Sequence, residues 1–154
     1  RSSEAATIVQ VDGCCLGRTG PGGWAVLINE RGASSPVWQE RSGHVEQPTT
    51  NQRMELIAAI EGLRPAAHPS TGLIVRSDSQ YLVLGMRDYL GNWVGNDWRR
   101  ADGKPVKNRD LWEQLSALSS RHPPVWHWIA GRSQDVIRDR AHQVAVAAAL
   151  ASLR

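Results

Sequence analysis

The order of strand and helix patterns limits the fold of this chain more than any other feature of its sequence. Three strand-like segments come first, and a turn cluster rich in glycine and proline separates the first two. Segments with helical spacing then alternate with short apolar segments up to a final helix. Successive strands favour antiparallel pairing, whereas strands separated by helices favour parallel additions to the same sheet. The order therefore predicts an α+β fold in which parallel strands extend three antiparallel ones.

Local signals predict where these elements begin and end. Strands are expected at residues 6–12, 24–28, 37–45, 73–75 and 125–129. Thr49 or Thr50 offers an N-cap for a helix that Pro65 stops. A turn is expected at residues 69–72, and further helices are expected at residues 79–84, 110–118 and 138–153. The helix from residue 79 is expected to be interrupted at Gly85, and the basic segment after it to be irregular because of Gly91, Gly95 and Gly103.

Length and composition limit the class of protein. A chain of 154 residues suffices for one domain with a proper core, so a single domain over residues 1–154 is expected, with residues 1–5 disordered. No apolar run approaches the length that spans a bilayer, which argues against a membrane role. The adjacent Cys14 and Cys15 suit neither a disulfide nor a zinc finger, so a cytoplasmic location is expected. Nothing in the sequence argues for an obligate oligomer, so a monomer is expected. Arg1 in place of methionine indicates a trimmed chain or a fragment.

The charge of the chain is compatible with a polyanionic partner. The formal net charge is +3 and the sequence pI is about 9.3, which by itself is weak evidence for nucleic-acid binding. The clustering of charge is more informative, because five basic residues fall within residues 99–109 and Trp93, Trp98 and Trp112 flank them. A solvated basic loop next to core tryptophans would give the same pattern.

Three carboxylates occupy positions where secondary-structure elements begin or end. Taken singly, Asp12 could face solvent, Glu55 could lie on a solvated helix face, and Asp78 could cap the following helix. If the first and fourth strands are neighbours, however, Asp12 and Asp78 emerge side by side, and the helix that carries Glu55 can cross above them. Hard oxygen ligands suit Mg²⁺ or Mn²⁺, and two such ions about 3.5–4 Å apart can catalyse an in-line phosphoryl displacement. The carboxylates thus predict a metal-dependent nuclease.

Four sequence motifs resemble those of one known family. They are Val11-Asp12-Gly13-Cys14-Cys15-Leu16-Gly17 with Gly20-Pro21-Gly22-Gly23, Asn51-Gln52-Arg53-Met54-Glu55-Leu56, Asp78-Ser79-Gln80-Tyr81, and Lys104-Pro105-Val106-Lys107-Asn108 with Asp110-Leu111-Trp112. In these motifs the chain resembles the bacterial-type ribonuclease H of type 1, which cleaves the RNA strand of RNA/DNA hybrids. The resemblance implies a ribonuclease H-like fold, with a five-stranded mixed sheet of three antiparallel and two parallel strands flanked by helices. It also implies that Asp12, Glu55 and Asp78 are the first three carboxylates of a four-acid site that binds two Mg²⁺ ions.

The resemblance further implies which residues contact an RNA/DNA hybrid. Gln52, Ser79 and Gln80 match positions that read the minor groove and the 2′-hydroxyl groups, which distinguish RNA from DNA. The other expected contacts lie near the DNA strand, in a basic protrusion and beside the first motif: Thr50, Asn51, Arg53, Tyr89, Trp93, Trp98, Arg99, Arg100, Cys14 and Arg18. Residues 94–97 carry no basic side chain, which predicts fewer phosphate contacts and a shallower salt dependence.

The chain departs from the family pattern at the fourth acidic position, where His142 stands, and three readings compete. In the favoured one, His142 supplies a ring nitrogen as the fourth ligand or orients a water, which weakens Mg²⁺ binding and gives a relative preference for Mn²⁺. In the second, Asp139, on the same helix face, supplies the missing carboxylate. In the third, the site is degenerate. Arg132 also replaces a histidine that the family is thought to use in proton transfer or product release.

The leading prediction is a hybrid-specific endoribonuclease that works by two-metal-ion catalysis and leaves 5′-phosphate and 3′-hydroxyl ends. An alternative is a catalytically weakened hybrid-binding module of a larger protein, such as a polymerase or a retroelement protein. A DNA-directed nuclease of the wider superfamily is a third candidate. Gln52, Ser79 and Gln80, which are expected to contact the 2′-hydroxyl groups, argue against it.

Overall fold

The five strands form one mixed sheet, as the order of the elements predicts. The computed structural model describes residues 6–32, 35–64, 72–131 and 133–154. The strands are β1 (Thr7–Cys15), β2 (Gly22–Asn29), β3 (Gln39–Val45), β4 (Leu73–Ser77) and β5 (Val125–Trp128), and their spatial order is β3-β2-β1-β4-β5. β1, β2 and β3 pair antiparallel, while β4 is parallel to β1 and β5 is parallel to β4. β1 and β4 are therefore neighbours at the centre of the sheet, which confirms the mixed topology.

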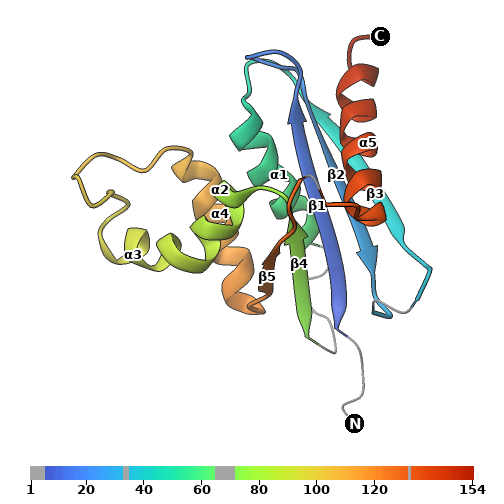
Figure 1. Cartoon of the computed structure of the whole chain (residues 1–154). Coiled ribbons are helices and arrows are strands. Elements are labelled where there is room, and N and C mark those ends of the chain that lie inside the picture. The colour runs from blue at the N-terminus through green and yellow to red at the C-terminus, as the bar shows by residue number, and fades with distance from the viewer. Residues whose placement is uncertain (1–5, 33–34, 65–71, 132) are drawn as a thin grey trace.

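Helices cover both faces of this sheet, as Figure 1 shows. The helical elements are α1 (Asn51–Leu63), α2 (Gln80–Leu84), η1 (Gly85–Tyr89), α3 (Leu90–Gly95), α4 (Arg109–Arg121) and α5 (Val136–Ala151). α1 and α4 lie on one face of the sheet, and α5 lies on the other. Within the described ranges, no helix combines the length and the apolar character that crossing a membrane requires. The expected disorder of residues 1–5 and most of the expected turn at residues 69–72 fall outside the described residues.

The two faces of the sheet have cores of different character. The larger core lies between the sheet, α1, α2 and α4, and it includes the fully buried Trp112 and Leu56. The smaller cluster, on the α5 side, consists of small side chains: Cys14, Ala25, Ala145 and Ala149. Because burial of apolar area stabilises a fold roughly in proportion to that area, most of the stabilisation comes from the larger core. α5 is attached by a thinner layer.

Two glycines allow the helices to approach the strands closely. A Cβ atom on Gly13 in β1 would lie 2.3 Å from the carbonyl carbon of Met54 in α1. A Cβ atom on Gly23 in β2 would lie 2.0 Å from the carbonyl oxygen of Ala145 in α5. Side chains at either position would force the helix away from the sheet. The absence of a side chain therefore sets the height of both helices above the strands that carry the site.

Two boundary predictions are wrong, and both have a tertiary cause. β1 was expected to end near Gly13, but it continues to Cys15 because its last residues pair with the start of β2. The helix expected to break at Gly85 continues instead through a π-helical turn into α3, so the segment after it begins as regular structure. A Cβ atom on Gly85 would lie 2.2 Å from the indole of Trp112. Gly85 makes room for a core side chain and does not stop the helix.

Candidate active site

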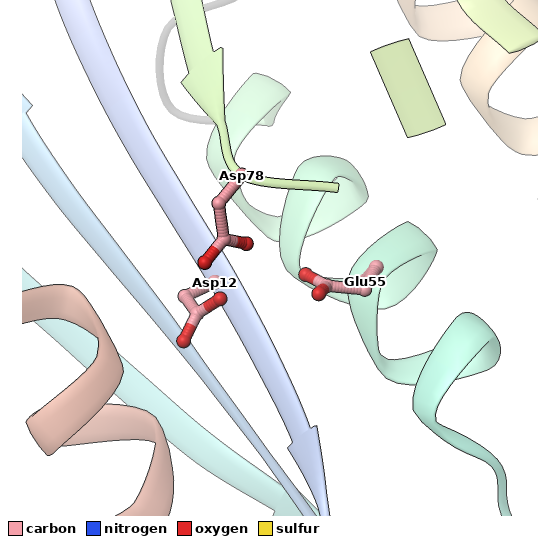
Figure 2. A group of neighbouring side chains, drawn as sticks. All are labelled: Asp12, Glu55 and Asp78. Atoms are coloured by element: carbon pink, nitrogen blue, oxygen red, sulfur yellow. The ribbon is translucent and has the colours of Figure 1, made fainter. Parts of the chain in front are cut away.

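Three carboxylates that are distant in the sequence meet where β4 ends beside β1, as Figure 2 shows. Asp12 lies in β1, Glu55 in α1, and Asp78 directly after β4. Each offers a carboxylate oxygen, and these oxygens all lie within 4.8 Å of one another. Asp12 is 4% exposed and Glu55 7% exposed, so neither is a solvated surface acid. The predicted side-by-side arrangement of Asp12 and Asp78 follows from the parallel pairing of β1 with β4.

Local hydrogen bonds place Glu55, and the end of β4 places Asp78. The hydroxyl of Thr50 accepts from the backbone N–H of Arg53 at 3.1 Å and caps α1, so that Glu55 falls in the second turn of that helix. The backbone N–H of Gly13 donates to Oε1 of Glu55 at 3.0 Å and ties the acid of α1 to β1. Asp78 occupies the carboxyl end of a parallel strand, where functional groups collect in sheets of this kind.

The environment favours the protonated forms of Asp12 and Glu55 when no cation is near. Burial and the neighbouring Asp78 carboxylate raise the pKa of Asp12 to about 7, although His142 acts in the opposite direction. Burial, followed by the charges of Asp12 and Asp78, raises the pKa of Glu55 well above its ordinary value. Gathering three anionic oxygens in a buried place is costly unless a positive charge joins them. The arrangement is therefore suited to a cation.

A side chain that the sequence analysis missed contacts this cluster. Nε and Nη2 of Arg138, in the first turns of α5, both donate to Oδ2 of Asp78, at 3.0 and 2.9 Å. Nη1 of Arg138 donates to Oδ1 of Asp139 at 3.0 Å. Arg138 and His142 are four residues apart on a helix and so share a face. That spacing is the signal that could have identified Arg138.

The two candidates for the fourth ligand lie in different surroundings. Nδ1 of His142 is 3.0 Å from Oδ2 of Asp12, so the imidazole borders the cluster. The carboxylate of Asp139 contacts Arg138 and is not part of the group formed by Asp12, Glu55 and Asp78. Arg132, the replacement for the family's histidine, lies outside the described residues.

The residues expected to contact a hybrid gather at the starts of α1 and α2. Asn51, Gln52 and Gln80 are exposed there, beside Thr50 and Ser79, whose hydroxyls cap the two helices. Arg53 is engaged internally as well: its guanidinium donates to both carboxylate oxygens of Asp110 in α4 at 3.1 and 2.8 Å.

The basic and aromatic segment projects away from the sheet on the side of α3, as Figure 1 shows. The ring of Tyr89 stacks on that of Trp93 with 5.9 Å between the ring centroids. Cζ of Arg109 lies 5.6 Å from the centroid of the Trp98 ring. Arg99 donates to the backbone oxygen of Gly103, and Arg100 is paired with Asp102.

A hollow of about 210 Å³ joins this segment to α1, and its lining includes Gln52, Trp93 and Arg100. The structure thus brings together three predicted contacts: Gln52 to the minor groove, Trp93 as an aromatic contact and Arg100 as a basic contact. Lys107 and Tyr81 also line the hollow and were not among the predicted contacts. Lys107 belongs to the Lys-Pro-Val-Lys-Asn motif, which is the signal that could have identified it.

The remaining two predicted contacts lie near the end of β1. Arg18 is exposed in the turn between β1 and β2. Cys14 is buried, and its thiol donates to the backbone oxygen of Ala145 in α5 at 3.5 Å. The alternation of β1 turns the Cys14 side chain under α5, and the expected nucleic-acid contact at Cys14 stays a prediction.

This fold and this cluster of acids define a metal-dependent nuclease of the ribonuclease H-like class. A family profile described as RNase H matches residues 4–150. The chain is 43% identical to the Ribonuclease H of Bordetella pertussis over 87% of its length and 83% of the relative, and 40% identical to that of Paracoccus denitrificans over 91% and 90%. Among solved structures it is similar to LC9-RNase H1, a type 1 RNase H with the type 2 active-site motif, with 30% identity, a TM-score of 0.81, and coverage of 98% of this chain and 75% of that one. The chain belongs to the ribonuclease H family.

Proposed function

We propose that this protein is an endonuclease that hydrolyses the RNA strand of RNA/DNA hybrids and leaves 5′-phosphate and 3′-hydroxyl ends. The observation that carries the proposal is the meeting of Asp12, Glu55 and Asp78, with oxygens within 4.8 Å of one another, in a chain of the ribonuclease H family. All three positions of the cluster carry acidic side chains, whereas a site that had lost its activity would tolerate apolar replacements. This favours an active enzyme over the alternative of a hybrid-binding module.

The donor set of the site fits divalent metal ions, on which this family depends. Asp12, Glu55 and Asp78 offer hard carboxylate oxygens, the ligands that Mg²⁺ and Mn²⁺ prefer. Two such ions, when bound, would activate the attacking water and stabilise the leaving oxygen of an in-line displacement. The residues of the chain do the rest: the three acids fix the position of the charge, and the Gly13 N–H holds the Glu55 carboxylate in place.

His142 is our candidate for the fourth position. Its Nδ1 already lies 3.0 Å from Asp12, whereas the Asp139 carboxylate is bound by Arg138. A neutral imidazole in place of a carboxylate leaves the site with one negative charge fewer, so Mg²⁺ should bind less tightly and Mn²⁺ should be relatively preferred.

The preference for a hybrid is assigned to the starts of α1 and α2. Gln52, Ser79 and Gln80 would contact the minor groove and the 2′-hydroxyls, which only the RNA strand carries. Thr50, Asn51 and Arg53 would face the DNA strand. Bases or sugars beyond the site would pass the hollow beside Trp93 and Arg100, where aromatic and basic groups suit a nucleic-acid backbone.

The test is cleavage of a 5′-labelled RNA/DNA hybrid beside RNA/RNA and DNA/DNA duplexes, with Mg²⁺ and Mn²⁺ titrated separately. Cleavage of the hybrid alone is the expected result, and a lower half-saturating concentration of Mn²⁺ would support a histidine-altered site. Hybrid binding without cleavage in either metal would instead establish the binding module.

We also propose that the protein is monomeric and works in the cytoplasm. Both statements rest on the sequence, which carries no sign of an obligate oligomer and places its cysteines side by side. Light scattering of the purified chain tests the first of them directly.

A further inference from the structure

Arg138 occupies the part of the acidic cluster that a metal ion would need. Two of its N–H groups converge on one oxygen of Asp78, at 3.0 and 2.9 Å. Both side chains are largely withdrawn from solvent, Arg138 being 19% and Asp78 14% exposed. An arginine held by two charge-assisted hydrogen bonds in such a place neutralises the carboxylate that it contacts. Oδ2 of Asp78 is thereby engaged.

We propose that Arg138 is the built-in counter-cation of the metal-free site, and that a divalent ion must displace it from Asp78 before the site is loaded. The inference rests on the proposed function, since it concerns how the metal ions of that function enter. Arg138 is in this view a positioning residue, which acts on the reaction through Asp78. It gives a role to a side chain for which the catalytic scheme has none.

The charges of the cluster give the physical reason for a competition. With Arg138 in place, one positive charge balances part of the negative charge of Asp12, Glu55 and Asp78. A divalent ion bound to the same carboxylates would lie next to the Arg138 guanidinium. Two adjacent positive charges repel strongly in a partly buried site. Binding of the metal and binding of Arg138 to Asp78 are therefore mutually unfavourable, and this coupling is reciprocal.

Asp139 offers the displaced guanidinium a second partner. Nη1 of Arg138 already donates to Oδ1 of Asp139 at 3.0 Å, and the Asp139 side chain is 49% exposed. A rotation of the Arg138 side chain would exchange Asp78 for Asp139 without leaving the guanidinium unpaired. Asp139 thus serves as the outer anchor of Arg138, a role different from that of the fourth metal ligand.

The same helix provides a matched control. Arg140, two residues further along α5, makes the same kind of paired contact with an acid, since its Nε and Nη2 donate to Glu40 of β3 at 2.6 and 2.8 Å. Its partner does not belong to the acidic cluster. Arg140→Gln therefore removes one positive charge and one ion pair from α5 and leaves Asp78 untouched.

The first test is calorimetric titration of Mn²⁺ and Mg²⁺ into the wild-type chain, Arg138→Gln and Arg140→Gln, all freed of metal with EDTA. We expect Arg138→Gln to bind both ions more tightly, by about 10-fold, a coupling of ordinary size between two sites, and Arg140→Gln to match the wild type. The thermal midpoint in EDTA should fall for Arg138→Gln, because Asp78 loses its counter-cation. Equal or weaker metal binding by Arg138→Gln would overturn the proposal.

A second test uses the wild-type chain and so does not depend on the folding of a variant. The Nε–H resonances of Arg138 and Arg140 and the backbone amide of Gly13 are followed by NMR while Mg²⁺ is added. We expect the Gly13 and Arg138 signals to move together and the Arg140 signal to stay. If Gly13 moves and Arg138 does not, only the displacement by metal is wrong; if neither moves, the metal site itself fails and this inference with it.

Discussion

The carboxyl group of Asp12 is part of the acidic cluster and is buried. We expect Asp12→Asn to abolish cleavage of the hybrid, since the amide carries no charge to hold a metal ion. His142→Ala should lower the rate only by about 10- to 100-fold, because the three carboxylates remain, an effect typical of groups that support a metal site from its border. Single-turnover cleavage in Mn²⁺ measures both variants. Equal losses would mean that His142 ranks with the carboxylates.

The raised pKa of Asp12 has a consequence for stability. The carboxyl titrates near its ordinary value of 3.8 in the unfolded chain and at about 7 in the folded one, so the folded state binds the proton more tightly. This group therefore lowers the free energy of unfolding progressively as the pH rises from about 4 to about 7, and Glu55 acts in the same direction. In EDTA, the thermal midpoint should be higher at pH 5 than at pH 8. Asp12→Asn, which cannot titrate, should reduce that difference by on the order of 5 °C.

Thermal unfolding followed by circular dichroism between pH 5 and pH 8 makes this comparison. The acids whose pKa values are lowered, such as Asp110 and Asp135, titrate below that range and do not interfere. A midpoint difference between pH 5 and pH 8 that is the same in Asp12→Asn and the wild type would show that Asp12 is not the group responsible.

At the scale of the elements, the height of α5 above the sheet depends on Gly23. The Cβ atom of Gly23→Ala would lie 2.0 Å from the Ala145 oxygen, so α5 must move outward. We expect a loss of stability of about 1–3 kcal/mol, the usual cost of overpacking, and slower cleavage, because α5 carries His142 and Arg138. Urea denaturation and the hybrid cleavage assay test both effects. Gly91→Ala in α3 is the control, since a Cβ atom there meets nothing within 4 Å and should leave both quantities unchanged.

The elements that depend on local signals could be predicted from the sequence. Thr50 caps α1 as its residue type indicates, and the strand patterns gave the mixed sheet with Asp12 beside Asp78. The continuation of the helix through Gly85 could not be predicted, because it depends on Trp112, a residue far along the chain that packs on that glycine. The contact of Arg138 with Asp78 is of the same kind, since it joins residues 60 positions apart.

At the scale of the whole molecule, the basic charges beside the hollow should determine the dependence on salt. Arg100 lines that hollow and is paired with the exposed Asp102. Arg100→Gln should weaken binding to any hybrid and lower the slope of log K against log salt by about one phosphate contact. Arg121→Gln, at the far end of α4, is the control. Binding titrations between low and moderate salt give the slopes, and identical slopes for Arg100→Gln and the wild type would remove Arg100 from the binding surface.

Because α5 packs on the sheet through a smaller core, substitutions on α5 differ in their consequences from substitutions in the main core. Asp12, Glu55 and Asp78 lie in or directly after elements of the main core, where a substitution disturbs folding and chemistry together. Arg138, Asp139 and His142 stand on a helix held largely by alanines, so they can be exchanged while the sheet remains intact. If His142 and Arg138 act on metal binding as proposed, substitutions within a few turns of this one helix would change the metal preference of the enzyme while the three acids stay in place.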